Sequence, residues 1–373
     1  MAYLIFVKRS NILKLLVILG RLGLDGISSV ALNYIENLNS FSVDKHVVIA
    51  GPYDVVLLDR LEKANTTVHI LPNRKRDTLS YLKQLYFLCN AGRFDIVHIH
   101  GNGASMGLDF LISKYVKVPV RISHGHSTSC DSRIINEIMK PLLYIGANVR
   151  FACSDTAGKW LYGNKTFTII NNAVNLKKFE YNSIIRDQYR KKLGISNEFV
   201  VGHVGYFERV KNHIFLIDVF KAFNKLLPES KLILIGDGSL KGNIIRKTAE
   251  YGLNDCVVFV EATEDVSCYY QAFDVLLFPS ICESLGLVTI EAQESCLPVL
   301  ASTAIPTEAK CTDRFFYESL DNKPEIWAKD LLGIANKRLK RGSEFCDISA
   351  LIKYSIEYQA EHLMTLYSSF LCI

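Results

Sequence analysis

Asp274-Val-Leu-Leu-Phe-Pro-Ser280 is a short apolar run that leads into Ile281-Cys-Glu-Ser-Leu-Gly-Leu-Val-Thr-Ile-Glu-Ala292. A run of this length that stops at polar residues and precedes a helical pattern is typical of a buried parallel strand followed by a helix. Alternating strands and helices predict an α/β fold, in which ligands bind beyond the carboxyl ends of the strands. The loop after Ser280 is therefore the first place to look for chemistry.

The same alternation recurs in two series along the chain, separated by a looser stretch after Asn171-Asn172. We expect strands in the first series at residues 15–19, 46–50, 68–71, 96–99, 118–123 and 148–152. In the second series we expect them at residues 199–204, 231–235, 256–260, 274–278 and 299–301. The sequence therefore predicts two doubly wound, Rossmann-like α/β domains, residues 1–175 and 176–353, with an interdomain cleft. A C-terminal helix over residues 354–373 is expected to pack back toward the N-terminal domain.

The composition fits this architecture and narrows the class of partners. A chain of 373 residues with 49% hydrophobic and 22% charged residues has the balance of a globular protein with two domains. The formal net charge of +5 is small for this length, so no nucleic-acid partner is expected. The ten cysteines include no CxxC pair, which argues against a zinc site and a disulfide framework. No apolar run approaches the ~20 residues of a spanning helix. We expect a cytoplasmic protein, with peripheral membrane contact left open.

Two glutamates stand out in the opening stretch. Glu283 lies on the loop, and Glu291 falls in the second turn of a helix expected from Leu287. Gly286 lets the backbone turn closely, and the unpaired N–H groups of Leu287 and its neighbours at the helix start can bind a diphosphate. Carboxylates beside such a site can accept hydrogen bonds from sugar hydroxyls. The alternative is that both are ordinary acids that stabilise a helix start.

The surrounding residues decide between these interpretations. Pro-Ser-x-x-Glu-x-x-Gly-Leu-x-x-x-Glu-Ala, followed by Leu297-Pro-Val-Leu-Ala-Ser, resembles the family 4 glycosyltransferases of the GT-B fold. The likeness extends over residues 95–100, 121–126, 153–161 and 204–213, and it is greatest to bacterial enzymes that build capsular or exopolysaccharide repeat units.

This resemblance implies a retaining, metal-independent transferase of the hexosyltransferase type. Its donor would be a nucleoside-diphosphate sugar, with a UDP-sugar expected, and its acceptor a lipid-linked saccharide. It also implies that Glu291 binds the donor ribose and that Glu283 faces the donor sugar as a catalytic residue. No other cofactor is expected. No Asp-x-Asp lies at a strand end, so no metal site is predicted.

The resemblance has departures near the expected phosphate site. Tyr206 stands where family members often have arginine, so Arg209 is the candidate replacement. Arg209 and Lys211 follow a strand expected to end near Gly205, where two cations can neutralise a leaving diphosphate. The alternative is a solvated basic loop. Ser284 replaces a frequent glycine after the first glutamate.

Glycines and histidines complete the predicted site. Gly236 and Gly238 form a turn where a nucleotide can approach the backbone, although an ordinary tight turn explains them equally well. His124 and His126 end a strand of the N-terminal domain, and the resemblance implies that they act in the active cleft. The pair at residues 98 and 100 is expected to hydrogen-bond within the protein instead.

Two other functions remain open on sequence alone. A nucleotide-sugar 2-epimerase has the same architecture and also cleaves at the anomeric carbon. A non-catalytic accessory subunit could keep the fold without the reaction, since fold does not imply function. In the preferred hypothesis, the C-terminal domain binds the donor and the N-terminal domain binds the acceptor.

Overall fold

The structure is a computed structural model that describes residues 12–38, 42–128, 130, 132–263 and 265–371. Its internal packing divides the chain into two compact units. The first runs to Ala173 and takes in the last helix, which begins at Ile356, and the second is Val174–Ser355. Each unit is built on a parallel sheet with helices between the strands, so the predicted pair of doubly wound α/β domains is confirmed.

Within the described residues, the first unit has a seven-stranded parallel sheet in the order β3-β2-β1-β4-β5-β6-β7. The strands are β1 (Leu13–Leu19), β2 (Val43–Ile49), β3 (Thr66–Ile70), β4 (Ile96–Gly101), β5 (Val120–Gly125), β6 (Val149–Ala152) and β7 (Thr168–Ile169). The direction of winding reverses between β1 and β4. The first six strands overlap the predicted runs, whereas β7 was not predicted.

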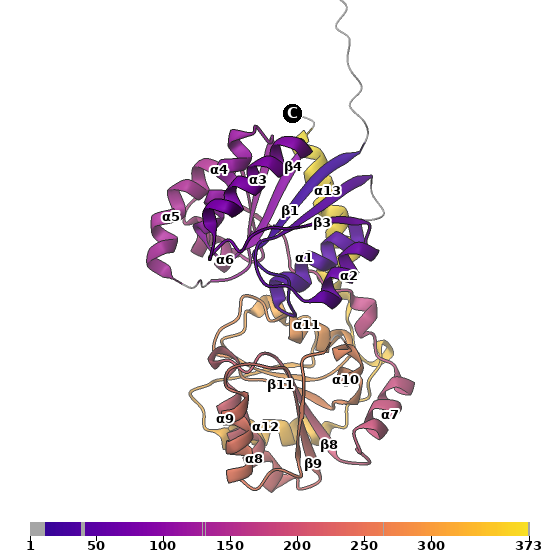
Figure 1. Cartoon of the computed structure of the whole chain (residues 1–373). Coiled ribbons are helices and arrows are strands. Elements are labelled where there is room, and N and C mark those ends of the chain that lie inside the picture. The colour runs from indigo at the N-terminus through magenta and orange to yellow at the C-terminus, as the bar shows by residue number, and fades with distance from the viewer. Residues whose placement is uncertain (1–11, 39–41, 129, 131, 264, 372–373) are drawn as a thin grey trace, which may run out of the picture. The chain divides into compact units, whose positions relative to one another are not determined.

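Helices cover both faces of this sheet (Figure 1). One face carries α1 (Gly26–Asn37), α2 (Val55–Lys63) and α13 (Ile356–Leu371). The other carries α3 (Thr78–Gly92), α4 (Gly107–Tyr115) and α5 (Arg133–Gly146), which lie side by side, and α6 (Asp155–Tyr162) follows β6. Right-handed crossovers on either side of a reversal put their helices on opposite faces, which explains the division.

The last helix, α13, returns the chain to the first unit. Ile356, Ala360, Leu363 and Tyr367 are buried on one side of it, and that spacing gives a continuous apolar stripe. The stripe packs against the unit that contains α1, so the expected C-terminal helix is present. Every helix in the described part of the chain falls short of the length or apolarity that a bilayer-spanning segment requires.

Within the described residues, the second unit has a six-stranded parallel sheet in the order β10-β9-β8-β11-β12-β13. The strands are β8 (Phe199–Val204), β9 (Ser230–Ile235), β10 (Val257–Val260), β11 (Val275–Phe278), β12 (Val299–Ser302) and β13 (Phe315–Glu318). The helices are α7 (Ser183–Lys192), α8 (His213–Leu226), α9 (Lys241–Glu250), α10 (Val266–Ala272), α11 (Leu287–Glu294) and α12 (Pro324–Lys337). The winding reverses between β8 and β11.

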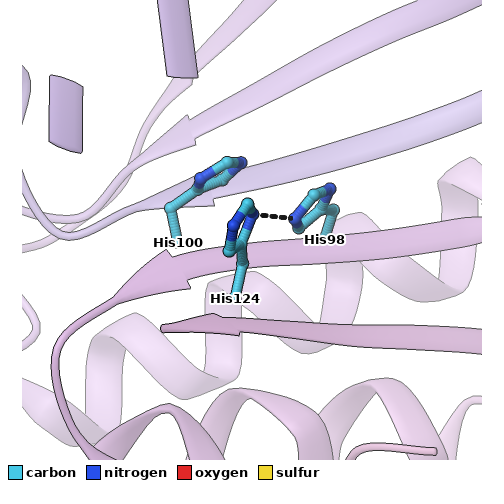
Figure 2. Close-up of side chains that lie close together, drawn as sticks. All are labelled: His98, His100 and His124. Carbon is cyan, nitrogen blue, oxygen red and sulfur yellow. Dashed lines mark hydrogen bonds between the residues drawn. The ribbon is translucent and has the colours of Figure 1, made fainter. Parts of the chain in front are cut away.

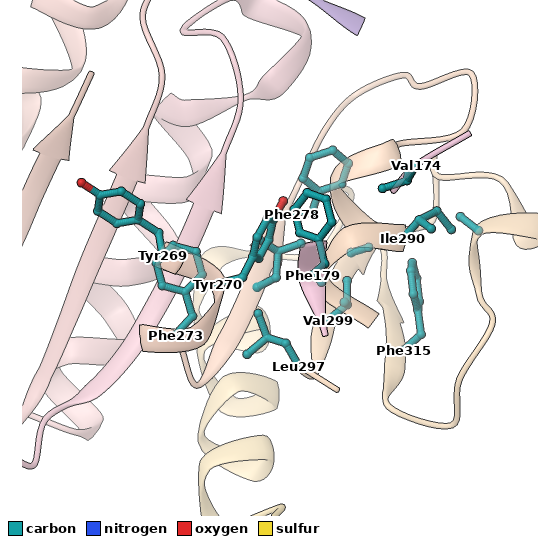
Figure 3. Packing of buried hydrophobic residues seen from close by; sticks show 14 of the residues in the cluster. Val174, Phe179, Tyr269, Tyr270, Phe273, Phe278, Ile290, Leu297, Val299 and Phe315 are labelled. Atoms are coloured by element: carbon teal, nitrogen blue, oxygen red, sulfur yellow. The ribbon is translucent and has the colours of Figure 1, made fainter. Parts of the chain in front are cut away.

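The strand β11 shows why the opening stretch is apolar throughout. Phe278 lies with Tyr270 in a buried cluster on one face of the sheet (Figure 3), and Leu276 belongs to the same cluster. Val275 and Leu277 join a separate buried cluster with residues of α8 and α12. A strand covered on both faces has no solvent side, so every position is apolar. This burial fixes the place of the loop that follows β11.

Candidate functional site

The site forms in the second unit where the winding reverses. β8 and β11 are neighbours in the sheet, but β8 continues to β9 on one side and β11 to β12 on the other. The loops that leave their carboxyl ends therefore begin side by side and lead in opposite directions, which is the usual ligand position in such sheets. Hydrogen bonds join the two loops: Ile281 N–H donates to Val210 O at 2.8 Å, and Asn212 Nδ2 donates to Pro279 O at 3.2 Å.

Two of the predicted site residues form an ion pair across these loops. Lys211 Nζ lies 2.5 Å from Glu283 Oε1, and both side chains are mostly buried. The ammonium also sits 5.0 Å above the centre of the Phe278 ring. The other oxygen, Glu283 Oε2, accepts no hydrogen bond from the described residues. The pair thus holds a cation and an available carboxylate oxygen at the carboxyl edge of the sheet.

Glu291 is held by a tyrosine that the sequence did not indicate. Tyr270, on α10, donates its hydroxyl to Glu291 Oε2 at 2.8 Å. Burial raises the pKa of Glu291, while the Tyr270 hydrogen bond and the charges of Lys178 and Lys211 work in the opposite direction. The tyrosine orients one carboxylate oxygen and leaves Oε1 for another donor. Tyr270 belongs to an apolar helical pattern, so nothing in the sequence separates it from ordinary core.

The start of α11 lies between the two glutamates. Gly286 has φ +80°, a conformation that glycine adopts without strain, and no described side chain caps the helix. The first turn contains no acidic residue, because Glu283 precedes the helix and Glu291 is its fifth residue. These positions do not fit the interpretation of both acids as helix-start residues. The first N–H groups of a helix have no partner within it, so those of Leu287 and the next residue can bind an anion.

Three other residues were predicted to contact the nucleotide-sugar donor, and none of them takes part in these side-chain contacts. Arg209 is exposed, and its guanidinium makes no hydrogen bond or ion pair with the described residues. Gly236 and Gly238 have φ +145° and +152°, and added Cβ atoms would lie 2.2 Å from Gly205 O and 2.7 Å from Phe207 N. Close approach of two loops is therefore sufficient to explain both glycines. Their contact with a nucleotide stays a prediction.

The first unit brings four histidines together at the carboxyl ends of β4 and β5. His98 Nε2 lies 3.1 Å from His124 Nδ1, and His100 Nδ1 lies 2.9 Å from His126 Nε2. Two further contacts close the ends of this network: the Tyr367 hydroxyl lies 2.6 Å from His98 Nδ1, and Asn172 Oδ1 lies 3.1 Å from His126 Nδ1. His98 and His100 therefore bond within the protein, as expected. The partners Tyr367 and Asn172 were not predicted.

Three of these histidines are close enough together to be considered as ligands of one metal ion. Ring nitrogens of His98, His100 and His124 lie within 4.8 Å of one another (Figure 2). However, the His98 and His100 rings are stacked, with centroids 4.3 Å apart and 17° between their planes. A histidine binds metal through a lone pair in the plane of its ring, and nearly parallel planes at this distance do not meet at one ion. The cluster fits a hydrogen-bond network better than a set of metal ligands.

Burial keeps these histidines neutral near pH 7. It lowers the pKa of His126 to about 4 and that of His98 to about 3, and it holds the pKa of His100 and His124 well below the usual range. In the second unit it lowers the pKa of His203 to about 4. Neither His124 nor His126 therefore supplies positive charge at neutral pH. Only His124 Nε2 of these two rings has no hydrogen-bond partner among the described residues.

Comparisons with known proteins agree with this fold. Residues 185–311 match the family described as glycosyl transferases group 1. The chain is 27% identical over 290 residues to the putative glycosyltransferase EpsF of Bacillus subtilis, covering 74% of this chain and 75% of that protein. It is 26% identical over 301 residues to an Escherichia coli UDP-Gal:alpha-D-GlcNAc-diphosphoundecaprenol alpha-1,3-galactosyltransferase, covering 75% and 76%. The crystal structure of Anabaena Alr3699/HepE, a complex with UDP and glucose, superimposes with a TM-score of 0.74 at 17% identity, covering 96% and 97%. The resemblance to GT-B glycosyltransferases is thereby confirmed.

The buried histidines predict how stability depends on pH. Their pKa values are lower in the folded chain than in the unfolded one, so unfolding takes up protons below about pH 6.5. Their contribution is complete above that pH and is lost as the pH falls toward 4, at about 1.4 kcal/mol per histidine per pH unit. Acids whose pKa is raised by burial, such as Glu294 at about 7, have the opposite effect, because the folded chain gains stability when they take up protons. Among the described residues, fewer acids than histidines show such a shift. Urea unfolding should show a large loss of stability between pH 7 and 5.

Two variants test whether the buried histidines cause this pH dependence of stability. In His203→Asn, the amide can still donate to Leu277 O, which lies 2.8 Å from His203 Nδ1, but nothing titrates. The unfolding free energy of His203→Asn should fall less steeply between pH 7 and 5 than that of the wild type. His362→Asn changes an exposed histidine, and its unfolding free energy should follow the wild-type curve. Stability that stays level from pH 7 to 5 would contradict the burial of neutral histidines.

Proposed function

We propose that this chain, whose residues 185–311 match the group 1 glycosyl transferases, transfers a sugar from a nucleoside-diphosphate sugar to a lipid-linked saccharide. The donor is expected to be a UDP-sugar, and the transfer to be retaining and independent of metal. The observation that carries the proposal is the Lys211–Glu283 ion pair beside the uncapped start of α11. The name of the E. coli relative supports a UDP-sugar donor and a lipid-linked acceptor.

In this proposal the donor lies on the second unit. Its ribose hydroxyls donate to Glu291, whose other oxygen Tyr270 already orients. Its diphosphate accepts from the N–H groups at the start of α11, and its sugar hydroxyls donate to Glu283. Lys211 then serves two anions, Glu283 and the diphosphate. A cation held in a mostly buried position stabilises charge more effectively than one in open water.

The reaction we propose balances without a metal ion or an enzyme nucleophile. The bond between the anomeric carbon and the donor's phosphate oxygen breaks, and its electron pair leaves with the diphosphate. The acceptor oxygen attacks from the same face, and its proton passes to an oxygen of the leaving diphosphate. The cationic side chain and the helix start stabilise the developing negative charge.

The acceptor is proposed to bind to the first unit, beside His124 and His126. Both ring nitrogens of His126 already have partners in the protein, so the atom we propose for a sugar hydroxyl is His124 Nε2, which has no partner among the described residues. A neutral ring suits a hydroxyl rather than a phosphate, which would favour a cation. Since the acceptor carries a lipid, the protein would work as a peripheral protein at a membrane surface.

The proposed reaction is tested with a panel of nucleoside-diphosphate sugars and a lipid-linked saccharide acceptor. We expect one donor to give a product that mass spectrometry shows to be larger by one sugar, with the anomeric configuration of the donor retained by NMR. The rate should be unchanged by EDTA, because protein groups neutralise the diphosphate. An epimerised nucleotide sugar formed without acceptor would point to the epimerase, and no reaction with donor binding intact would point to an accessory subunit.

Replacing Lys211 separates a role in catalysis from a role in stability. Lys211→Ala should lower the transfer rate about 100-fold, the scale seen when a donor to developing charge is removed. Lys231→Ala is the matched control, because Lys231 Nζ lies 3.2 Å from Glu198 Oε1 in another partly buried ion pair of the same unit. Each variant leaves a partly buried carboxylate without its partner, so both should lose about 1–3 kcal/mol of unfolding free energy. Equal transfer rates in the two variants would remove Lys211 from the site.

A further inference from the structure

Helix α5 exposes an unusual number of large apolar side chains. Ile134, Ile135, Ile138 and Ile145 have exposed fractions of 75, 57, 68 and 56%. Ile134, Ile138, Pro141 and Ile145 recur every three or four residues and so form a stripe along one side of the helix, and Ile135 lies beside Ile134 and three residues before Ile138. Single exposed apolar residues need no explanation, but a contiguous patch on one helix marks a surface for interaction.

The inner side of α5 is fixed, so the stripe cannot turn inward. A Cβ on Gly107 of α4 would lie 2.5 Å from Leu143 N, and one on Gly146 would lie 2.5 Å from Phe110 Cβ. Asn136 Oδ1 accepts from Ala104 N–H at 2.7 Å. These close contacts set the rotation of the helix about its axis and hold the isoleucines outward.

Exposed apolar residues continue on the helices beside it. Leu79 and Phe87 of α3 and Tyr115 of α4 have exposed fractions of 83, 57 and 75%. Figure 1 shows α3, α4 and α5 next to one another, across the sheet from α1 and α13. Together the outer sides of α3, α4 and α5 form what we call the α5 face.

The charge of this region favours an anionic partner. Residues 74–146 contain ten lysines and arginines against five acids, an excess equal to the +5 of the whole chain. Lys83, Lys114, Lys117 and Arg133 are exposed among the apolar residues of the α5 face. A second copy of the chain would bring these cations together, and their repulsion would oppose pairing. Apolar side chains among cations instead match the interface of a bilayer that contains anionic lipid.

We propose that the α5 face binds the surface of an anionic lipid bilayer, with the isoleucines of α5 among the acyl chains and the cations at the headgroups. α5 begins seven residues after His126, so this face starts at the same sheet edge as the proposed acceptor position. A lipid-linked acceptor would reach that edge from the bilayer. This last step rests on the proposed function, whereas binding to the bilayer does not.

Vesicle flotation tests the α5 face with the full chain. Wild type should float with phosphatidylcholine vesicles that contain about one third phosphatidylglycerol at low ionic strength, and less with pure phosphatidylcholine or in high salt. Ile134→Asp/Ile138→Asp should reduce the bound fraction at least tenfold. The matched control is Ile184→Asp/Ile352→Asp, which changes isoleucines of the second unit with exposed fractions of 67 and 60% and should still float. Circular dichroism melts should show both variants folded.

A charge variant keeps the test decisive if the isoleucine variant does not fold. Lys83→Glu/Lys117→Glu alters exposed side chains, and we expect it to weaken flotation several-fold at low salt. The proposal is wrong if wild type does not float with anionic vesicles, or if the charge and isoleucine variants float as wild type does. It is also wrong if gel filtration shows a dimer that the isoleucine variant dissociates.

A separate measurement distinguishes failure of the proposed transferase function from failure of bilayer binding. Transfer to a water-soluble acceptor without a lipid tail should be equal in wild type and in the isoleucine variant. Its absence from both would contradict the proposed function while flotation still supported the α5 face.

Discussion

The ion pair between Lys211 and Glu283 joins residues that are 72 positions apart in the chain. It exists because β8 and β11 are neighbours at the point where the winding of the sheet reverses. The two loops that leave these strands diverge, and the backbone hydrogen bond from Ile281 to Val210 ties them together. The uncapped start of α11 and the carboxylate of Glu291 then follow from where β11 ends. The proposed donor site therefore depends on that one feature of strand order.

The first unit has the same reversal, between β1 and β4, but different chemistry at its edge. Buried histidines occupy the ends of β4 and β5, and their lowered pKa values keep them uncharged. The Tyr367 hydroxyl of the last helix closes the network at His98. The two units thus place contrasting groups at corresponding sheet edges: a cation with carboxylates in the second, and buried neutral rings in the first. A charged nucleotide and an uncharged sugar need different surroundings of this kind.

Much of this fold could be predicted from sequence, because strands covered on both faces are apolar throughout and stop abruptly at polar loops. The strands β7 and β13 were not predicted, because the first is only two exposed residues long and the second is mostly half-buried. Gly286 indicated where α11 begins, and the positions of both glutamates followed from it. The pairing of Lys211 with Glu283 and the bond from Tyr270 to Glu291 could not be predicted. Both depend on side-chain contacts between segments that are distant in the chain, which local patterns do not encode.

The proposed function requires that the carboxyl edge of the second sheet bind a nucleoside diphosphate through Glu291. Calorimetric titration of UDP into wild type, Glu291→Ala and Glu325→Ala tests it most directly, because Glu325 is an exposed acid in the first turn of α12 and so represents an ordinary helix-start residue. We expect Glu291→Ala to weaken UDP binding about 10- to 100-fold, which is what the loss of charge-assisted hydrogen bonds costs, and Glu325→Ala to bind UDP as wild type does. Equal affinity in all three proteins, with Glu291→Ala folded, would contradict it.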